Sequence, residues 1–472
     1  MITTNKNIYP KWIYDGIKNS QQTGRAFIIS YVKKIEPIDP LHFFRNGAEL
    51  FFGQRLFWSD PSGEMSIVGV GNIYVIEAEK EMRFQTVKEK WTKLLDQIIL
   101  NDESEGSVIG TGPLLLGGFS FDPYKPKSSL WQEFKDGMMF LPAFMLTHLR
   151  GDSWLTINLQ VAEDDDPEQT AMKLENELNT LLKEKEESLD CEKDQSYKTM
   201  IQEVEPESWI HSVRKATHQI QQGRLEKVVL ARELQLQATD TILAEDILYR
   251  LREQQPASYI FAIENGEKCF IGASPERLVK KEGNQLLTTC LAGTIRRGKT
   301  IEQDVELGQQ LLHDRKNRYE HDLVVQMIRS AMEEGCSKVV TPSEPILYKL
   351  KDVQHLYTPI VGYSDSTSIL DMVERLHPTP ALGGYPREQA MELIRKEEIL
   401  DRGWYGAPVG WLDRQGNGEF VVAIRSGMIY HHLASLFAGC GIVEDSIAES
   451  EYEETMIKFK PMLTAIGGKI NE

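Results

Sequence analysis

The sequence predicts an α+β fold with large mixed or antiparallel β-sheets. Short apolar runs bounded by Gly, Pro, Asp and Asn fill roughly the first 160 residues, which is typical of strands joined by turns. Helical periodicity follows, and from residue 205 onward helices and strands are mixed without the regular βαβ period of a parallel sheet. We find no internal repeat and no low-complexity segment.

The N-terminal region is expected to be rich in strands. Strands are predicted at Ala26–Tyr31, Glu49–Trp58 and Trp154–Val161. Gly69-Val-Gly71 and Gly110-Thr-Gly112 do not extend to the GxGxxG pattern of a dinucleotide site, so tight turns are the better interpretation of both.

A charged helix and a linker are predicted near residues 163–200. Asp166 can cap the helix, and Pro167 suits its first position. The polar stretch Asp190–Lys198 after it is the best candidate for a linker. An apolar stripe at helical spacing marks the buried face of the helix and consists of Ala171, Leu174, Leu178 and Leu181.

The C-terminal half mixes both element types. A helix beginning near Glu205 carries Ile210, Val213, Thr217 and Ile220 on one face, and Gly223 can end it. Further elements are expected in chain order: strands at 227–232, 270–277 and 287–293, helical segments over 301–335, and strands at 406–411 and 419–425 joined by a turn at 415–418.

Length and charge limit the function classes. The 472 residues allow about three domains or one large one. The net charge of −18 argues against broad contact with nucleic acid or anionic membranes, both of which require a basic surface. A small anionic substrate stays compatible with this charge if local cations or a metal ion surround it.

Cysteine usage and hydropathy indicate a soluble, reduced, cytoplasmic protein. The five cysteines are an odd number without CxxC spacing, which fits neither a disulfide framework nor a zinc knuckle. The N-terminus lacks the apolar core of a secretory signal, and no apolar run approaches the roughly 20 residues of a membrane helix.

Carboxylates gather at a helix predicted near the C-terminus. Ser446 and Glu449 match the S-x-x-E pattern of a capping box that opens the helix. Glu451, Glu454 and Lys458 then fall on one helix face. Acidic residues favoured by the helix dipole are one interpretation. A Mg²⁺ site is the other, because this ion prefers a few carboxylates together with water or substrate oxygens.

A second source of carboxylate for such a site is Glu320 in Arg318-Tyr-Glu-His-Asp322, although the stretch taken by itself favours a charged helix surface over a ligand. Two glycines in Phe437-Ala-Gly-Cys-Gly-Ile442 either form a strand-to-helix turn or let backbone N–H groups approach an anion. Arg425, which we place at the end of the apolar strand run Val421–Ile424, needs a carboxylate partner from a ligand or from the protein.

Two further residues have side chains suited to acid–base chemistry. Lys227 begins a strand, where it is either solvated or desolvated enough to act as a base. Glu276 lies at a strand end, as an ion-pair partner or as a carboxylic acid kept protonated by burial. His431 and His432 are adjacent in a predicted strand, so we expect one surface histidine and one core histidine.

Together these segments resemble the chorismate-utilising enzymes, which include isochorismate, salicylate, anthranilate and aminodeoxychorismate synthases. The resemblance covers most of residues 205–465. It rests on five ordered blocks, which are Leu225–Arg232, Ile271–Glu276, Leu291–Thr294, Arg318–Val324 and Tyr405–Lys458.

The resemblance implies a single large unit of two packed β-sheets surrounded by helices. Residues 1–204 would then be an N-terminal part of the same fold that contributes strands, and residues 205–466 the chorismate-binding catalytic region. It also implies Mg²⁺ as cofactor and chorismate as small-molecule substrate. No obligatory protein partner is evident, and we expect a monomer or a weak dimer.

Matching positions give a candidate site. Glu320 and Glu454 resemble direct metal ligands, with Glu451 near the metal. Lys227 and Glu276 resemble the catalytic base and acid. The positions that resemble substrate-binding residues are Tyr405, Arg425, Gly439, Gly441, Lys458, Gly293, His355, Ala381 and Leu382.

Particular side chains separate the branches of the family. Ala292 stands where aminodeoxychorismate synthases carry a nucleophilic lysine, and Lys227 stands where anthranilate synthases have glutamine. His377-Pro-Thr-Pro-Ala-Leu382 resembles isochorismate synthases, whereas salicylate synthases usually have Thr-Ala near this point. The long N-terminal region is similar to the menaquinone-pathway isochorismate synthases.

The resemblance thus implies addition of water at C2 of chorismate and loss of the C4 hydroxyl, giving isochorismate. Three alternatives stay open: a siderophore-pathway isochorismate synthase, a salicylate synthase that also eliminates pyruvate, and a non-catalytic chorismate-binding subunit.

Overall fold

The computed structural model describes residues 11–103, 108–183, 197, 199–349 and 353–467, apart from the side chain of Glu320. It confirms the α+β prediction. The helices are α1 Lys11–Thr23, α2 Pro40–Asn46, α3 Ala48–Phe51, α4 Arg83–Leu95, α5 Pro167–Leu181, α6 Pro206–Gln221, α7 Ala244–Gln254, α8 Ile301–His313, α9 Arg315–Glu333, α10 Ile369–Leu376, α11 Arg387–Glu397 and α12 Ala448–Ile466. The strands are β1 Phe27–Ile35, β2 Arg55–Ser59, β3 Met65–Ala78, β4 Ile98–Asp102, β5 Leu114–Phe119, β6 Gly137–Leu149, β7 Asp152–Val161, β8 Thr199–Glu203, β9 Lys227–Ala238, β10 Tyr259–Asn265, β11 Lys268–Ser274, β12 Arg277–Glu282, β13 Gln285–Arg296, β14 Lys338–Val340, β15 Ile346–Lys349, β16 Val353–Tyr363, β17 Gly384–Tyr385, β18 Pro408–Asp413, β19 Gly418–Val422, β20 Ser426–Tyr430 and β21 Leu433–Ile442.

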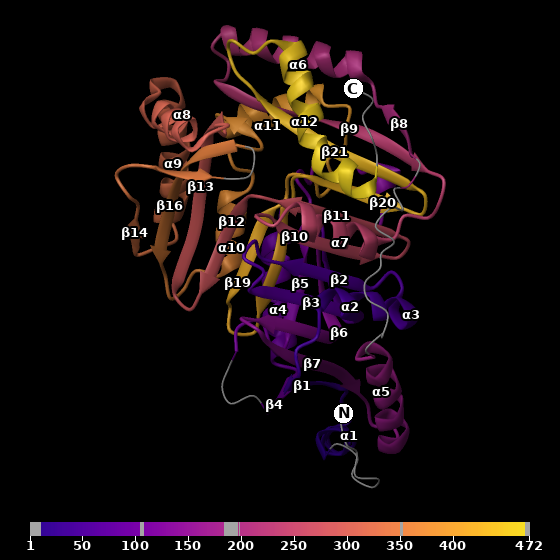
Figure 1. Ribbon diagram of the computed structural model, residues 1–472. Helices are drawn as coiled ribbons and strands as arrows, with labels where there is room; N and C mark the ends of the chain where they lie inside the picture. The colour runs from indigo at the N-terminus through magenta and orange to yellow at the C-terminus, as the bar shows by residue number, and fades with distance from the viewer. Residues whose placement is uncertain (1–10, 104–107, 184–196, 198, 350–352, 468–472) are drawn as a thin grey trace.

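Hydrogen bonds join the described strands into one continuous network of 21 strands, largely antiparallel. Two apolar cores lie on its faces. The first brings together side chains from distant strands, such as Leu116 of β5, Leu230 of β9 and Phe420 of β19, all without exposed surface. The second lies beneath α1, α2, α5, α7 and α12, which cover the outer face (Figure 1). The strands therefore form packed layers with helices outside.

Strands from the first 160 residues pair directly with strands from the C-terminal half. β2 lies antiparallel to β10, with Phe57 opposite Ala262, and β5 lies antiparallel to β18, with Leu116 opposite Trp411. Residues far apart in the sequence are thus held in one sheet.

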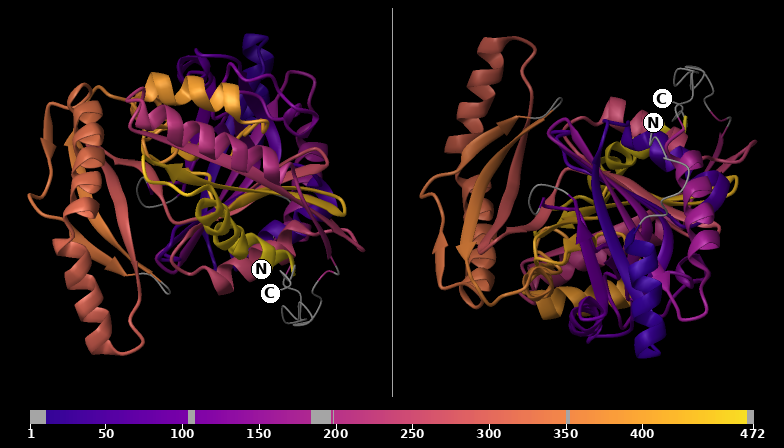
Figure 2. Two further views of the ribbon diagram at one scale, coloured as in Figure 1. Left: turned by 90° about the horizontal axis from the view of Figure 1, so that it is seen from above. Right: turned by 90° about the horizontal axis from the view of Figure 1, so that it is seen from below.

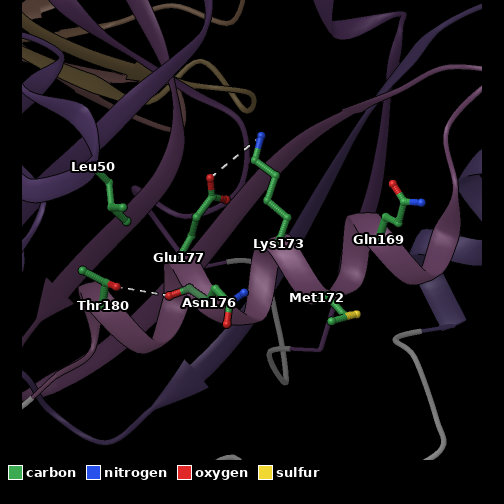
Figure 3. Close-up of a pocket in the computed structure, with 7 residues that line it drawn as sticks. All are labelled: Leu50, Gln169, Met172, Lys173, Asn176, Glu177 and Thr180. Atoms are coloured by element: carbon green, nitrogen blue, oxygen red, sulfur yellow. Dashed lines mark hydrogen bonds and ion pairs between the residues drawn. The ribbon is translucent and has the colours of Figure 1, made fainter.

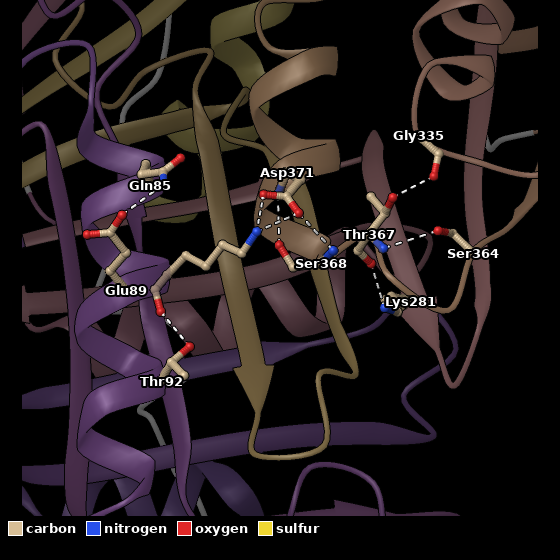
Figure 4. Close-up of polar contacts among 10 residues, drawn as sticks. Gln85, Glu89, Thr92, Lys281, Gly335, Ser364, Thr367, Ser368 and Asp371 are labelled. Atoms are coloured by element: carbon tan, nitrogen blue, oxygen red, sulfur yellow. Dashed lines mark hydrogen bonds and ion pairs between the residues drawn. The ribbon is translucent and has the colours of Figure 1, made fainter.

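A lobe made of β13–β16, α8 and α9 projects from this body (Figures 1 and 2). Backbone pairing of β12 with β13 connects it to the body. Lys281 Nζ donates to the carbonyl oxygen of Thr367 at 2.6 Å, and Thr367 Oγ1 donates to the carbonyl oxygen of Gly335 (Figure 4). Beside them, the ammonium group of Lys88 on α4 lies 2.7 Å from the carboxylate of Asp371 on α10. The Thr367–Gly335 bond ties the end of α9 in the lobe to the body, and the other two contacts fasten Thr367 and α10 within the body.

The α5 helix forms for the predicted reasons. The Asp166 side chain accepts a hydrogen bond from the amide of Gln169, Pro167 is its first residue, and the predicted apolar stripe is buried. Most of the predicted linker lies outside the described residues. No helix in the described part of the chain is long and apolar enough to cross a membrane.

Three predictions of local structure outside the candidate site are wrong. Residues 48–51 are helical, so the strand predicted over 49–58 begins only at Arg55. Gly69 and Gly71 lie within β3 instead of in a tight turn. His431 and His432 form the exposed turn between β20 and β21, so neither is a core histidine.

Candidate active site

The predicted site residues of the body come from several separate segments of the chain. Lys227 begins β9, Glu276 lies between β11 and β12, and Arg425 lies between β19 and β20. β21 pairs with β9, and α12 follows it in the chain. Lys227, Glu276 and Arg425 are each partly buried as whole residues.

Glu276 has the properties of an acid that is partly protonated near neutrality. Burial raises the pKa of its carboxyl to about 7, against the opposing effect of Arg425 and Lys227, whose positive charges favour the carboxylate. Its backbone is fixed, because the Glu276 amide donates to Ser274 Oγ at 3.2 Å and its carbonyl accepts from the Val422 amide at 3.0 Å.

Arg425 does not end a strand, as the sequence had indicated. β19 ends at Val422, and Arg425 has a left-handed backbone with φ of 51°, which is uncommon for a residue with a side chain. Its carbonyl accepts from the Ala273 amide at 3.0 Å, which holds the turn against β11. Burial lowers the pKa of its guanidinium, while the charges of Tyr405, Glu276 and Glu454 oppose that effect.

Gly439 and Gly441 lie inside β21, opposite Ala231 and Val229 of β9, and not in a turn before the helix. The absence of a side chain at both positions leaves space beside the strand. A Cβ atom on Gly441 would lie 2.8 Å from Lys227 Cε and 3.4 Å from its Nζ. One on Gly439 would lie 3.4 Å from the hydroxyl oxygen of Tyr405. The bare strand therefore makes room for both side chains.

The carboxylates of α12 lie beside this strand. Lys458 Nζ donates to the carbonyl oxygen of Gly439 at 2.9 Å and forms an ion pair with Glu454 at 2.6 Å. The predicted capping box is absent from α12, because the Ser446 hydroxyl donates to Glu451 at 2.7 Å instead of capping the helix. Glu451, Glu454 and Lys458 thus all lie near the glycines of β21.

The lobe contributes the opposite side of the site. Gly293 has φ of +77° at an irregularity in the β13–β16 pairing, where a side chain would be strained and would lie 3.2 Å from Asn317 Oδ1. His355 Nδ1 is 2.8 Å from Thr294 Oγ1. Burial lowers the pKa of His355, and Arg425 lowers it further, which places the imidazole near that guanidinium.

The fit of a metal ion depends on the type of donor. Glu451 and Glu454 offer carboxylate oxygens, the ligands that Mg²⁺ prefers. The side chain of Glu320 on α9 lies outside what the structure describes, and within the described residues no group of three suitable ligands is close enough to hold a metal. The carboxylate oxygens of Glu451 and Glu454 are thus of the donor type that Mg²⁺ prefers.

Two residues near the site were missed by sequence reasoning. His321, next to Glu320, is fully buried, with Nδ1 3.1 Å from the Ala292 carbonyl oxygen and Nε2 2.7 Å from Thr358 Oγ1. It attaches α9 to β13 and β16. Arg402 donates to the carbonyl oxygen of Leu382 at 2.9 Å. The i,i+4 spacing of Glu398 and Arg402 was the available sequence signal.

Ala381 and Leu382 lie between α10 and β17, where Leu382 is buried and Ala381 is partly buried. A Cβ atom on Gly406 would lie 3.4 Å from Leu382 Cδ1, so this segment approaches the turn that carries Tyr405. A separate surface pocket of about 440 Å³ lies on α5 (Figure 3) and contains none of the predicted site residues.

The fold and the conjunction of an acid, two cations and bare glycine backbone define an enzyme of the chorismate-binding type. A family model described as chorismate binding enzyme matches residues 15–467, and the chain belongs to this family.

Curated relatives agree with this assignment. The chain is 45% identical to the isochorismate synthase MenF of Bacillus subtilis, over 99% of this chain and 100% of that protein. It is 37% identical to the salicylate biosynthesis isochorismate synthase of Pseudomonas aeruginosa, over 96% of this chain and 93% of that one.

A solved structure shares the fold. The menaquinone-specific isochorismate synthase MenF of Escherichia coli superposes with a TM-score of 0.77 at 24% identity, covering 96% of this chain and 99% of that chain.

Proposed function

We propose that the protein is an isochorismate synthase that converts chorismate to isochorismate with Mg²⁺, for menaquinone biosynthesis. The observation that carries the proposal is the placement of Lys227 and Glu276 close enough to interact electrostatically within the partly buried site. The full-length similarity to an isochorismate synthase of the menaquinone type supports the choice of reaction and pathway.

The reaction needs a base and an acid at the same time. To act as the base, Lys227 must first lose the positive charge that it carries beside Glu276; in its neutral form it takes a proton from the attacking water, whose oxygen forms a bond to C2. The ring double bonds shift as the C4 hydroxyl departs, and protonated Glu276 supplies the proton that lets it leave as water. The raised pKa of Glu276, about 7, suits this role because a catalytic acid works best with a pKa near the operating pH.

The remaining residues hold the substrate. Arg425 and Tyr405 bind the enolpyruvyl carboxylate, since a guanidinium can pair with a carboxylate through two hydrogen bonds. Lys458 and the backbone of Gly439 and Gly441 contact a further carboxylate. The ring is lined by Gly293, His355, Ala381 and Leu382.

Glu320, Glu454 and Glu451 are the residues that would hold Mg²⁺. The ion would balance the charge of the ring carboxylate and fix its orientation. The ammonium group of Lys458 lies 2.6 Å from the Glu454 carboxylate, so Lys458 would have to give up this ion pair for Glu454 to serve as a Mg²⁺ ligand.

The location and assembly of the protein also follow as proposals. The four cysteines of the described chain, Cys269, Cys290, Cys336 and Cys440, are all free thiols, which agrees with a reducing cytoplasm. The body and the lobe together carry every proposed site residue, so we infer that a monomer or weak dimer is active.

The test is incubation of the purified protein with chorismate and Mg²⁺, with separation of the products by chromatography. Lasting isochorismate supports the proposal, salicylate with pyruvate supports the salicylate synthase alternative, and no turnover leaves only a binding protein. Lys227→Gln should abolish hydration while chorismate still binds. Lys280→Gln is the matched control, because Lys280 is a partly buried strand lysine paired with Glu282 away from the site.

A further inference from the structure

Along one edge of β9, part of the backbone is hydrogen-bonded to two side chains instead of to a neighbouring strand. β17 pairs with its beginning, with Gly384 opposite Val228, and β8 pairs with its later part. Between these two strands, the Val229 carbonyl accepts from Arg402 Nη2 at 2.7 Å, and the Ala231 amide donates to Glu398 Oε1 at 2.7 Å. The Arg402–Glu398 pair thus takes the place of strand backbone in this gap.

The pair is buried and its bonding capacity is heavily used. Side-chain exposure is 3% for Arg402 and 2% for Glu398, and Arg402 Nε donates to Glu398 Oε2 at 2.8 Å. Nη1 donates to the Leu382 carbonyl at 2.9 Å, and the guanidinium lies 4.2 Å from the centre of the Phe121 ring. One side chain therefore holds β9, the Leu382 segment and Phe121 together.

These contacts converge on three proposed site elements. Val229 is two residues from Lys227 on the same strand, Leu382 is a proposed ring contact, and the Tyr405 amide donates to the Arg402 carbonyl at 2.8 Å. We propose that Arg402, together with Glu398, is a positioning residue that sets the mutual placement of Lys227, Leu382 and Tyr405. This inference rests on the proposed function, because it assigns those residues their roles.

Stability alone is a weak explanation for such a pair. Buried ion pairs cost desolvation energy, and well-packed apolar replacements are often as stable. The geometry here has a specific requirement, because a planar guanidinium donates to a carboxylate and to two carbonyl groups from separate segments. A lysine keeps the charge but cannot reproduce that fork.

The chain offers a matched control pair. Arg55 and Glu264 are also buried, with side-chain exposures of 3% and 6% and bonds of 2.8 and 2.6 Å between them. The Arg55 guanidinium lies 4.3 Å from the centre of the Phe44 ring and donates to the Phe44 carbonyl. This pair lies on β2 and β10 and contacts no proposed site residue.

The experiment compares Arg402→Lys with Arg55→Lys in the full chain, by steady-state kinetics with chorismate and Mg²⁺ and by thermal unfolding. We expect Arg402→Lys to lower kcat/KM by about 100-fold, the scale of a misplacement near 1 Å. Its pH profile should shift as well, because a displaced Lys227 changes the field at Glu276. At equal folded fraction, Arg55→Lys should retain parental kinetics and pH profile.

A second variant covers the case in which Arg402→Lys does not fold. Glu398→Gln keeps an oxygen acceptor for the Ala231 amide but removes the charge and the second oxygen, which accepts from Arg402 Nε. We therefore expect a smaller loss of about tenfold, again with a shifted pH profile. Parental kcat/KM and pH profile in a folded Arg402→Lys or Glu398→Gln variant overturn the proposal. The proposal is also overturned if Arg402→Lys loses activity only in proportion to its loss of folded protein, as we expect for Arg55→Lys.

Failure of the proposed function can be told apart from failure of the positioning proposal, because in the first case the parent protein itself would not turn over chorismate. Hydrogen exchange then still tests the positioning. The Ala231 amide should exchange faster in Arg402→Lys and remain protected in Arg55→Lys; unchanged protection in Arg402→Lys would refute the placement.

Discussion

Replacement of Gly441 by alanine displaces the proposed base without changing its chemistry. The new Cβ would lie 2.8 Å from Lys227 Cε, whereas carbon atoms in contact normally lie about 3.5–4.0 Å apart. The lysine side chain must therefore retreat by about 0.7–1.2 Å. A misplacement of this size costs about 100-fold in rate, so Gly441→Ala should lower kcat about 100-fold. The measurement is isochorismate formation at saturating chorismate and Mg²⁺.

The fold should tolerate this change, because the atom that meets the new methyl group belongs to a flexible side chain and not to the backbone. Thermal unfolding should therefore shift little, by roughly 1 kcal/mol or less. Ser435→Ala in the same strand is the control and should retain parental kcat. Parental kcat in Gly441→Ala would refute the reasoning, since Lys227 would then not need its present position.

Three further outcomes are expected. Because the pKa of Glu276 is about 7 and its protonated form is the acid, kcat/KM should fall above about pH 7, roughly tenfold per pH unit; a flat profile to pH 9 would contradict this role. Arg425→Lys keeps the charge and loses the planar fork, so KM for chorismate should rise by about tenfold or more, and an unchanged KM would mean that Arg425 binds no substrate. Glu454→Gln should lose most turnover at ordinary Mg²⁺ and regain part of it when Mg²⁺ is raised, while far-ultraviolet circular dichroism stays parental; normal activity at ordinary Mg²⁺ would remove Glu454 from the metal site.

Elements set by local interactions were predictable from the sequence. The α5 helix follows from a cap, a proline and an apolar stripe that lie within a few turns of each other. The strand starting at Lys227 was visible from its β-branched run, and the structure extends it to Ala238. Predictions failed where a distant partner decides the conformation. The hydroxyl of Ser446 contacts Glu451 instead of capping α12, and Arg425 turns out of its strand where its carbonyl meets β11.

The sequence indicated which residues belong to the candidate site, but not how they are arranged in space. Family resemblance indicated the positions of Lys227 and Glu276, and their roles remain predictions. The raised pKa of Glu276 depends on burial by segments that come together only in the folded chain. Arg402 escaped notice because its partners, the carbonyl groups of Val229 and Leu382, lie 173 and 20 residues away, and backbone acceptors leave no mark in a sequence.

The pairing of β2 with β10 and of β5 with β18 has a consequence for anyone dissecting this chain. Residues 205–466 carry all of the proposed site residues. Alone, however, they would present three strand edges without their partners, those of β10, β18 and β9, because β8, the partner of β9, also lies before residue 205. Such edges recruit other chains and promote aggregation. The residues before 205 therefore protect these strand edges, and moving the catalytic half into another protein would require substitutes for β2, β5 and β8.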